Sequence, residues 1–216
     1  MLLSFVLLSL KSLAQNAHIS DSTLNEVCKT LVTKENKLLP DSDRVRQVIA
    51  KHISPILSTL NESEQTAAMT YTFYRLQRNC KEFKGILDQA TPNKGDWVSL
   101  NEKPKSTLTK KDFDKFLKIG NYSYLERSGD TVHINLTATT WEDHFKNGTY
   151  SRLTLHWIKN AEFQIEFMES NNEIRKNLSK PGDKYRYQLL EKHSDYYLMS
   201  LEIPGKSQFM TFKLYY

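Results

Sequence analysis

The chain has 216 residues, of which 39% are hydrophobic and 25% are charged, so it can bury a core and is not an intrinsically disordered polyampholyte. Its formal net charge of +5 comes from Lys and Arg residues spread along the whole chain. Without a concentrated basic segment, nucleic acid is not an expected partner. The length suits one larger domain or two small ones.

Residues 1–14 form a short apolar run that ends in the small-x-small sequence Ser12-Leu13-Ala14. This pattern is typical of a secretory signal peptide and its cleavage site, and the run is too short to span a bilayer. The alternative is a short N-terminal helix that packs on the domain. We expect cleavage before Gln15 and a secreted or periplasmic protein. No later stretch has the length and apolar character of a membrane-spanning helix.

Residues 20–119 carry apolar residues at helical spacing, which predicts a helical segment of three to four helices. The first helix begins near Ser20. The second follows Pro40 and is expected to kink or break just before Pro55, because proline lacks the backbone N–H that a helix interior needs. A short last helix is predicted over 109–120, where a Thr-x-x-Asp capping box precedes an apolar face and a terminal Gly.

The third predicted helix has the clearest stripe, and Asn61 or Ser63 is expected to cap it. Its apolar residues step by four and three positions: Met69, Phe73, Leu76, Cys80, Phe83 and Leu87. Such a stripe predicts core packing within a small helical unit. Residues 90–106, which follow it, are expected to form a polar connection.

Cys28 and Cys80 are the only cysteines, and each lies on the apolar stripe of its predicted helix. An even number of cysteines in an exported protein favours a disulfide, here with one possible pairing. The alternative is a pair of buried free thiols. Two cysteines do not supply a tetrahedral zinc site, and neither has a histidine at ligand spacing.

From residue 120 to 216 the apolar period changes to two. Apolar and polar residues alternate in 132–136, 153–157 and 163–167, and further strand-like runs occupy 185–190, 196–201 and 210–216. Turn sequences such as Lys146-Asn147-Gly148 and Pro181-Gly182-Asp183 separate these runs. The predicted fold class is α+β: the N-terminal helices pack on a C-terminal antiparallel β-meander or a partly closed, calycin-like barrel.

This C-terminal half carries a recurring order of short motifs: Gly120-Asn121-Tyr122-Ser123-Tyr124, Val132–Leu136, Leu155-His156-Trp157-Ile158-Lys159, Pro181-Gly182-Asp183, Tyr196-Tyr197 and Phe212-Lys213-Leu214. In this order the chain resembles a family of short secreted proteins of unknown function from the Bacteroidetes, mainly flavobacteria. The resemblance implies a lipocalin-like or calycin-like meander and an exported location. It implies no activity. One departure is Ala161, where relatives often have Cys.

Two clusters of polar residues are candidates for chemistry. His133 and His156 lie on the polar faces of their predicted strands together with Glu162 and Glu166, and imidazole and carboxylate groups bind divalent metals. The alternative, an ordinary solvated sheet face, is favoured because no His-x-His or His-Glu-x-x-His spacing is present. We therefore predict no metal site and no cofactor.

The segment Trp141-Glu142-Asp143-His144 places a histidine beside two carboxylates in an expected loop. A hydrolase that uses His144 or His156 as a general base is one hypothesis, but it needs a nucleophile or a bound water in reach of the ring. No nucleophile-elbow motif accompanies either histidine. We predict no catalytic residue on this basis.

Aromatic residues crowd the last strands, where they can fill the core or line a cavity. The preferred hypothesis is a non-enzymatic binding or envelope protein that uses the concave face or edge of its sheet, with a partner, a protein or a small apolar ligand, that the sequence does not identify. The alternative is a lipocalin-like carrier of a small apolar ligand. The residues expected to line its cavity are Phe163, Ile165, Tyr187 and Met210.

Overall fold

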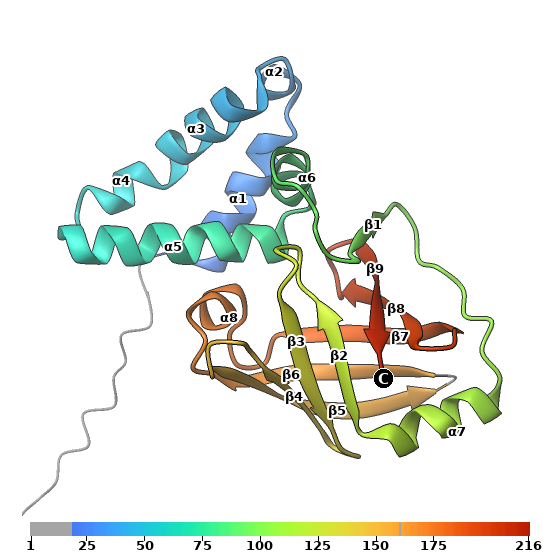
Figure 1. Ribbon diagram of the computed structural model, residues 1–216. Helices are drawn as coiled ribbons and strands as arrows, with labels where there is room; N and C mark the ends of the chain where they lie inside the picture. Colours follow the sequence, from blue (N-terminus) through green and yellow to red (C-terminus); the bar gives the residue numbers. More distant parts are fainter. Residues whose placement is uncertain (1–18, 160) are drawn as a thin grey trace, which may run out of the picture.

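A computed structural model describes residues 19–159 and 161–216 and shows an α+β protein, as predicted (Figure 1). The helices are α1 (Asp21–Leu31), α2 (Lys34–Lys37), α3 (Asp41–His52), α4 (Ser54–Leu57), α5 (Glu62–Asn79), α6 (Lys81–Ala90), α7 (Lys110–Ile119) and α8 (Glu173–Leu178). The strands are β1 (Val98–Leu100), β2 (Asn121–Leu125), β3 (Thr131–Leu136), β4 (Thr140–His144), β5 (Tyr150–Lys159), β6 (Glu162–Ser170), β7 (Lys184–Lys192), β8 (Tyr196–Ile203) and β9 (Gln208–Tyr215). The expected signal peptide, residues 1–14, lies outside the described residues.

Local sequence signals set the ends of several helices in the N-terminal lobe, which comprises α1 to α6. The Ser20 hydroxyl accepts a hydrogen bond from the Thr23 backbone N–H at the start of α1. Asn61 and Glu64 form a reciprocal capping box at the start of α5. The predicted break before Pro55 is confirmed, because α3 ends at His52 and α4 carries the proline in its first turn.

The third predicted helix is wrong as a single element, because the chain forms two helices there. Cys80 has an extended backbone (φ −125°, ψ 103°), and it ends α5 and begins α6. Met69 and Phe73 are 36% and 40% exposed, whereas Leu76, Cys80 and Phe83 are buried. The chain therefore turns at the middle of the apolar stripe, and only the later part of the stripe reaches the core.

Cys28 and Cys80 form the predicted disulfide, with their Cα atoms 5.5 Å apart. The bond joins α1 to the junction of α5 and α6. Around it lies the core of the helical lobe, whose buried apolar residues include Leu24, Val27, Leu31, Val48, Ile53, Ala68 and Leu76. The disulfide thus holds together elements that are distant in the sequence.

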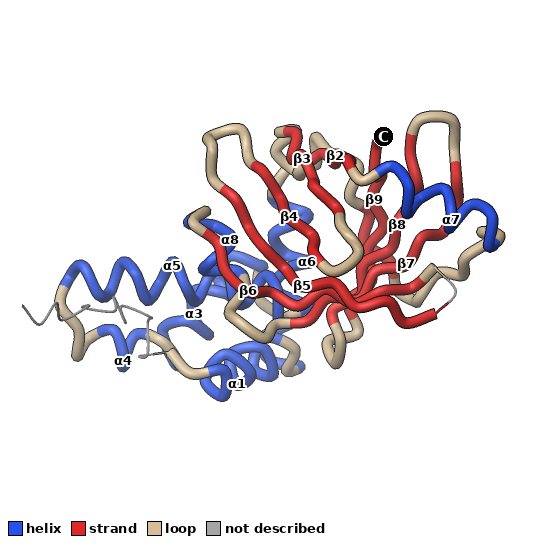
Figure 2. Tube along the Cα trace, turned by 90° about the horizontal axis from the view of Figure 1, so that it is seen from below, coloured by secondary structure: helices blue, strands red, loops and turns tan. Residues whose placement is uncertain are grey.

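Strands β2 to β9 form a closed antiparallel barrel of eight strands (Figure 2), and β1 is an additional strand on β9 (Figure 1). Successive strands pair along the chain, and the barrel closes where Ser123 of β2 pairs with Tyr215 of β9. In β3 the buried residues alternate with exposed ones, as the sequence pattern predicts. Closure leaves one face of each strand inside the barrel and the other face in solvent.

Two segments that we expected in the helical segment 20–119 belong to the barrel instead. Phe116 of α7 is fully buried in the barrel core, and its ring lies 5.4 Å from that of Tyr197. Trp97, just before β1, stacks on Phe212 with the ring centroids 4.4 Å apart. The residues of this predicted segment therefore divide between two cores, and α7 covers the barrel end away from the helical lobe (Figures 1 and 2).

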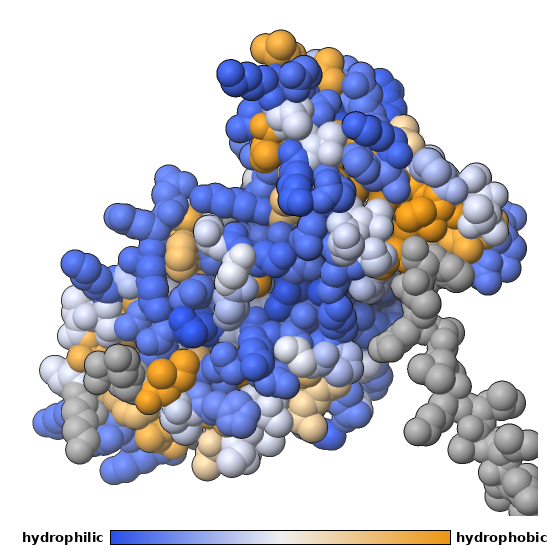
Figure 3. Space-filling view, turned by 180° about the vertical axis from the view of Figure 1, so that it is seen from behind, coloured by the Kyte–Doolittle hydropathy of each residue, from blue (hydrophilic) through white to orange (hydrophobic). Residues whose placement is uncertain are grey.

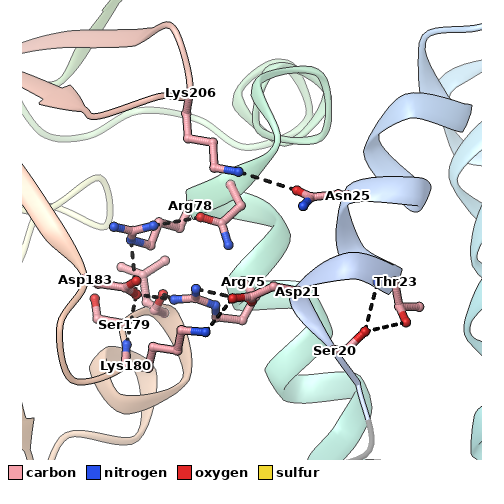
Figure 4. Close-up of polar contacts among 12 residues, drawn as sticks. Ser20, Asp21, Thr23, Asn25, Arg75, Arg78, Ser179, Lys180, Asp183 and Lys206 are labelled. Carbon is pink, nitrogen blue, oxygen red and sulfur yellow. Dashed lines mark hydrogen bonds and ion pairs between the residues drawn. The ribbon is translucent and has the colours of Figure 1, made fainter.

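The helical lobe docks on the other end of the barrel through buried polar contacts (Figure 4). Arg75 of α5 is 1% exposed and forms an ion pair with Asp183, which precedes β7. Arg78 donates a hydrogen bond of 2.9 Å to the Tyr185 hydroxyl. Its backbone carbonyl accepts a 3.0 Å bond from the Gln208 side chain. These contacts fix the lobe against Asp183, β7 and β9.

The substitution Asp183→Asn is expected to lower the free energy of unfolding by about 3 kcal/mol, because it leaves the Arg75 guanidinium charged and buried beside only the half-exposed Asp21. Urea unfolding followed by circular dichroism measures this loss. The control is Asp195→Asn, which changes an exposed carboxylate. Equal stability of the two variants would show that the ion pair does not hold the lobes together.

The surface seen from behind is mostly hydrophilic, and hydrophobic residues gather on it only in small groups (Figure 3). Within the ranges described, no helix combines the length and the apolar character needed to cross a membrane.

Candidate functional site: a cavity inside the barrel

A cavity of about 110 Å³ lies inside the barrel, beside α8. Inward-facing residues of several strands form its wall, because alternate side chains of every barrel strand point inside. Its aromatic lining consists of Trp97, Tyr124, Trp141, Phe167, Tyr185, Tyr187 and Phe212. Its polar lining includes the carboxyl group of Asp143, the hydroxyl groups of Ser151 and Ser179, and the ion pair of Arg175 with Glu126.

Asp143 is the most unusual residue of the cavity, because it places a carboxyl group inside the barrel. It lies on β4, where the buried residues Trp141 and Asp143 alternate with Glu142 and the exposed His144. Asp143 is 7% exposed. Its Oδ1 atom accepts a 2.9 Å hydrogen bond from the Trp141 indole. We expected this segment to be a loop, and that prediction was wrong: the segment is a strand that directs one of its carboxylates inward.

Burial raises the pKa of Asp143 to about 7, although hydrogen bonds from Trp141 and Tyr124 act in the opposite direction. Burial, followed by the nearby Asp143 charge, also raises the pKa values of Tyr124 and Tyr187 well above the ordinary tyrosine value. The carboxyl group therefore exchanges its proton near neutral pH. The two phenols remain protonated there and keep their ability to donate hydrogen bonds.

Arg175 and Glu126 form an ion pair at the side of the cavity next to α8. Arg175 also donates a 3.2 Å hydrogen bond to the Tyr124 hydroxyl, and its guanidinium lies 5.1 Å from the centre of the Phe145 ring. Both charged residues line the cavity and also an outer groove of about 560 Å³. The ion pair therefore separates the interior from the solvent.

The position of Arg175 follows from the start of α8. The Asn172 side-chain oxygen accepts hydrogen bonds from the backbone N–H groups of Ile174 and Arg175 and caps this short helix. The Asn172 amide also donates a 2.7 Å hydrogen bond to the Thr149 hydroxyl in the β4–β5 turn. Asn172 thus connects α8 to the rim of the barrel and positions Arg175 beside the cavity.

Comparisons with protein-family models, with curated proteins and with solved structures find no match to this chain. Function is therefore inferred from the chemistry of the cavity. It combines aromatic walls, one buried carboxyl group and several hydroxyl groups, which are features of sites that bind and orient a small molecule.

The structure brings two of the four predicted ligand-lining residues to the cavity. Ile165 and Tyr187 line it, whereas Phe163 and Met210 are buried elsewhere in the barrel core. Phe163 packs against its neighbours, with its ring 5.5 Å from that of Tyr187. Asp143 is a cavity residue that was not predicted from the sequence. The sequence offered one signal for it: in a strand, Asp143 lies on the same face as the apolar Trp141 two positions earlier, because alternate residues share a face.

The two histidines of the hydrolase hypothesis lie outside the barrel and apart from the cavity. His144 is 3.0 Å from Glu142, whose other oxygen accepts a 2.8 Å hydrogen bond from Arg152. His156 is exposed opposite Gln164 in the β5–β6 register. Within the described ranges, neither ring is hydrogen-bonded to a serine or cysteine, and no three His, Cys, Asp or Glu side chains are grouped as metal ligands.

Proposed function

We propose that this protein is an exported, non-enzymatic binding protein that holds a small ligand inside its β-barrel. The observation that carries this proposal is the cavity with the buried Asp143 carboxyl group on its wall. A barrel that only needed a packed core would be more stable with an apolar residue at this position, because burying a carboxyl group is costly. Groups that reduce stability in this way are concentrated at functional sites.

The size of the cavity limits the ligand. Pockets for drug-sized molecules are roughly 300–1,000 Å³, and the cavity here is about 110 Å³. An apolar cavity of about 150 Å³ accepts a molecule of the size of benzene. We therefore infer a ligand of at most that order of size, smaller than the long-chain molecules that fill larger barrels.

The Arg175–Glu126 ion pair supports a route for the ligand. It separates the cavity from the outer groove, and the partners are 20% and 28% exposed. A partly exposed ion pair contributes little to stability, so it can open without unfolding the barrel. In this proposal the ligand enters beside α8 when the two side chains separate.

Export rests on the expected signal peptide, on the disulfide and on the resemblance to secreted Bacteroidetes proteins. A disulfide persists in an oxidising compartment such as the periplasm, and Cys28 and Cys80 are joined. Expression of the full chain in a bacterium of that group is expected to give an exported product that begins at Gln15 and gains about 2 Da on reduction. Recovery of an uncleaved, reduced chain from the cytosol would contradict export.

Filling the cavity tests the binding function. Leu153 of β5 is 5% exposed and lines the cavity, whereas Ile158 of the same strand is 46% exposed. We expect small aromatic fragments to shift the NMR signals of the Trp97 and Trp141 indole groups in the oxidised protein. Leu153→Phe should weaken this binding at least tenfold, because the added ring occupies the ligand volume.

The matched control is Ile158→Phe, which adds the same volume outside the barrel and should bind the fragments normally. Fragment binding that survives Leu153→Phe would place the site elsewhere on the protein. A fragment set that leaves both indole signals unchanged would argue against the cavity as a binding site.

A further inference from the structure

The Asp143 carboxyl group has no basic partner inside the barrel. In the described part of the chain, no Lys, Arg or His side chain forms an ion pair with it, and its hydrogen bonds come from two neutral groups, the Trp141 indole and the Tyr124 hydroxyl. Arg175 is the nearby cation, but it is engaged by Glu126 and the Tyr124 hydroxyl. A buried carboxylate without a counter-ion is costly, and a positively charged ligand would remove that cost.

The aromatic rings around the cavity form one continuous group. Trp141 stacks on Tyr187 with the ring centroids 5.4 Å apart, and Tyr187 meets Phe212 edge-on at 5.8 Å. Phe212 in turn stacks on Trp97, and Trp97 meets Tyr124 edge-on at 5.9 Å. Tryptophan and tyrosine faces attract organic cations through their negative ring quadrupoles. The same walls exclude bulk water, which strengthens the attraction.

An anionic ligand does not fit this arrangement. It would lie beside the Asp143 carboxyl group in a cavity where the guanidinium charge is already neutralised by Glu126. Like charges at such short range in a low-dielectric interior repel strongly. A neutral ligand would be tolerated, but it would leave the carboxyl group without compensation.

We propose that the cavity binds a small organic cation, an amine or ammonium compound no larger than benzene, with its charge on the Asp143 carboxylate and its apolar part between the aromatic rings. This inference rests on the binding function proposed above. The Tyr124 and Tyr187 side chains also line the cavity and provide cation–π contacts. Specificity for the charge then comes from one carboxyl group, and specificity for size comes from the closed barrel.

Isothermal titration calorimetry of the oxidised protein at pH 8 tests the charge of the ligand, with isobutylamine, isobutanol and isobutyrate as probes of similar shape that are no larger than benzene. Isobutylamine is expected to bind at least tenfold more tightly than isobutanol, and isobutyrate more weakly than both. Asp143→Asn should remove the preference for the amine and retain the binding of the alcohol. Glu142→Gln is the matched control, because Glu142 is on the same strand but does not line the cavity.

Three outcomes would overturn the proposal, and they separate it from the binding function. Equal affinity for isobutylamine and isobutanol, with binding lost in Leu153→Phe, would reject the cation and keep the cavity as a binding site. An amine affinity that Asp143→Asn leaves unchanged would reject the role of the carboxylate. No heat with any of the three probes would reject both the ligand class and the binding function.

Discussion

Asp143→Asn is expected to raise the free energy of unfolding by about 4 kcal/mol at pH 8 and to leave it nearly unchanged at pH 4. Burial raises the pKa of this carboxyl group from 3.8 to about 7 in the folded protein. Each pKa unit corresponds to about 1.36 kcal/mol, so the full shift limits the stabilisation by Asp143→Asn to about 4 kcal/mol. Asn has nearly the same shape and carries no charge.

The direction of this pH dependence follows from proton binding to Asp143. Between about pH 4 and pH 7 the folded protein holds a proton on Asp143 that the unfolded chain has released, so the contribution of this group is fully present below pH 4. It is lost progressively as the pH rises to about 7. Asn does not titrate, so the free energy of unfolding of the variant rises relative to that of the native protein over the same pH interval. Tyr124 and Tyr187 stay protonated there because their pKa values are raised.

Urea unfolding at a series of pH values measures this effect, with Glu142→Gln as the control for loss of a carboxylate on the outer face of the same strand. A stabilisation by Asp143→Asn that is equal at pH 4 and pH 8 would point to packing and not to charge. No stabilisation at pH 8 would mean that the carboxylate is better solvated than its burial implies. The same variant is expected to lose amine binding, so its gain in stability and its loss of function would occur together.

The double substitution Cys28→Ser and Cys80→Ser is expected to lower the free energy of unfolding by about 4 kcal/mol. The disulfide spans 52 residues, and closing a loop of that length removes about this much conformational freedom from the unfolded chain. Because both cysteines pack in the core of the helical lobe, we expect this lobe to lose its structure first. The interface around Arg75 would loosen next.

Urea unfolding of the double variant, and of the native protein with reductant, measures the loss. The two samples are expected to agree within about 1 kcal/mol, because serine differs little from a free thiol in size. A loss below about 1 kcal/mol in both samples would show that packing alone holds α1 against the α5–α6 junction. Near-ultraviolet circular dichroism of the barrel tryptophans should change later than the helical signal at 222 nm.

Much of the fold follows from signals that lie close together in the sequence. Asn61, one of the two expected cap residues, begins α5, and the capping box at Thr109 forms as its local spacing predicts. The alternation of 132–136 places the expected residues inside and outside. The pairing of Cys28 with Cys80 followed from their number and from the apolar stripes on which they lie. The caps and the strand pattern depend on residues that are close together in the sequence. The disulfide has only one possible pairing, because the chain has two cysteines.

The candidate site depends on contacts that no local pattern contains. Closure of the barrel requires Ser123 and Tyr215, from its first and last strands, to meet, and only closure turns the inner face of β4 into the wall of a cavity. Arg175 reaches that cavity because α8 packs on the barrel rim, and Trp97 reaches it from the connection that appeared merely polar. The sequence alone determines most of the helices and strands, because helix capping and hydrophobic period are local. Tertiary structure decides which side chains are buried together, because burial is a property of surfaces brought together from distant parts of the chain.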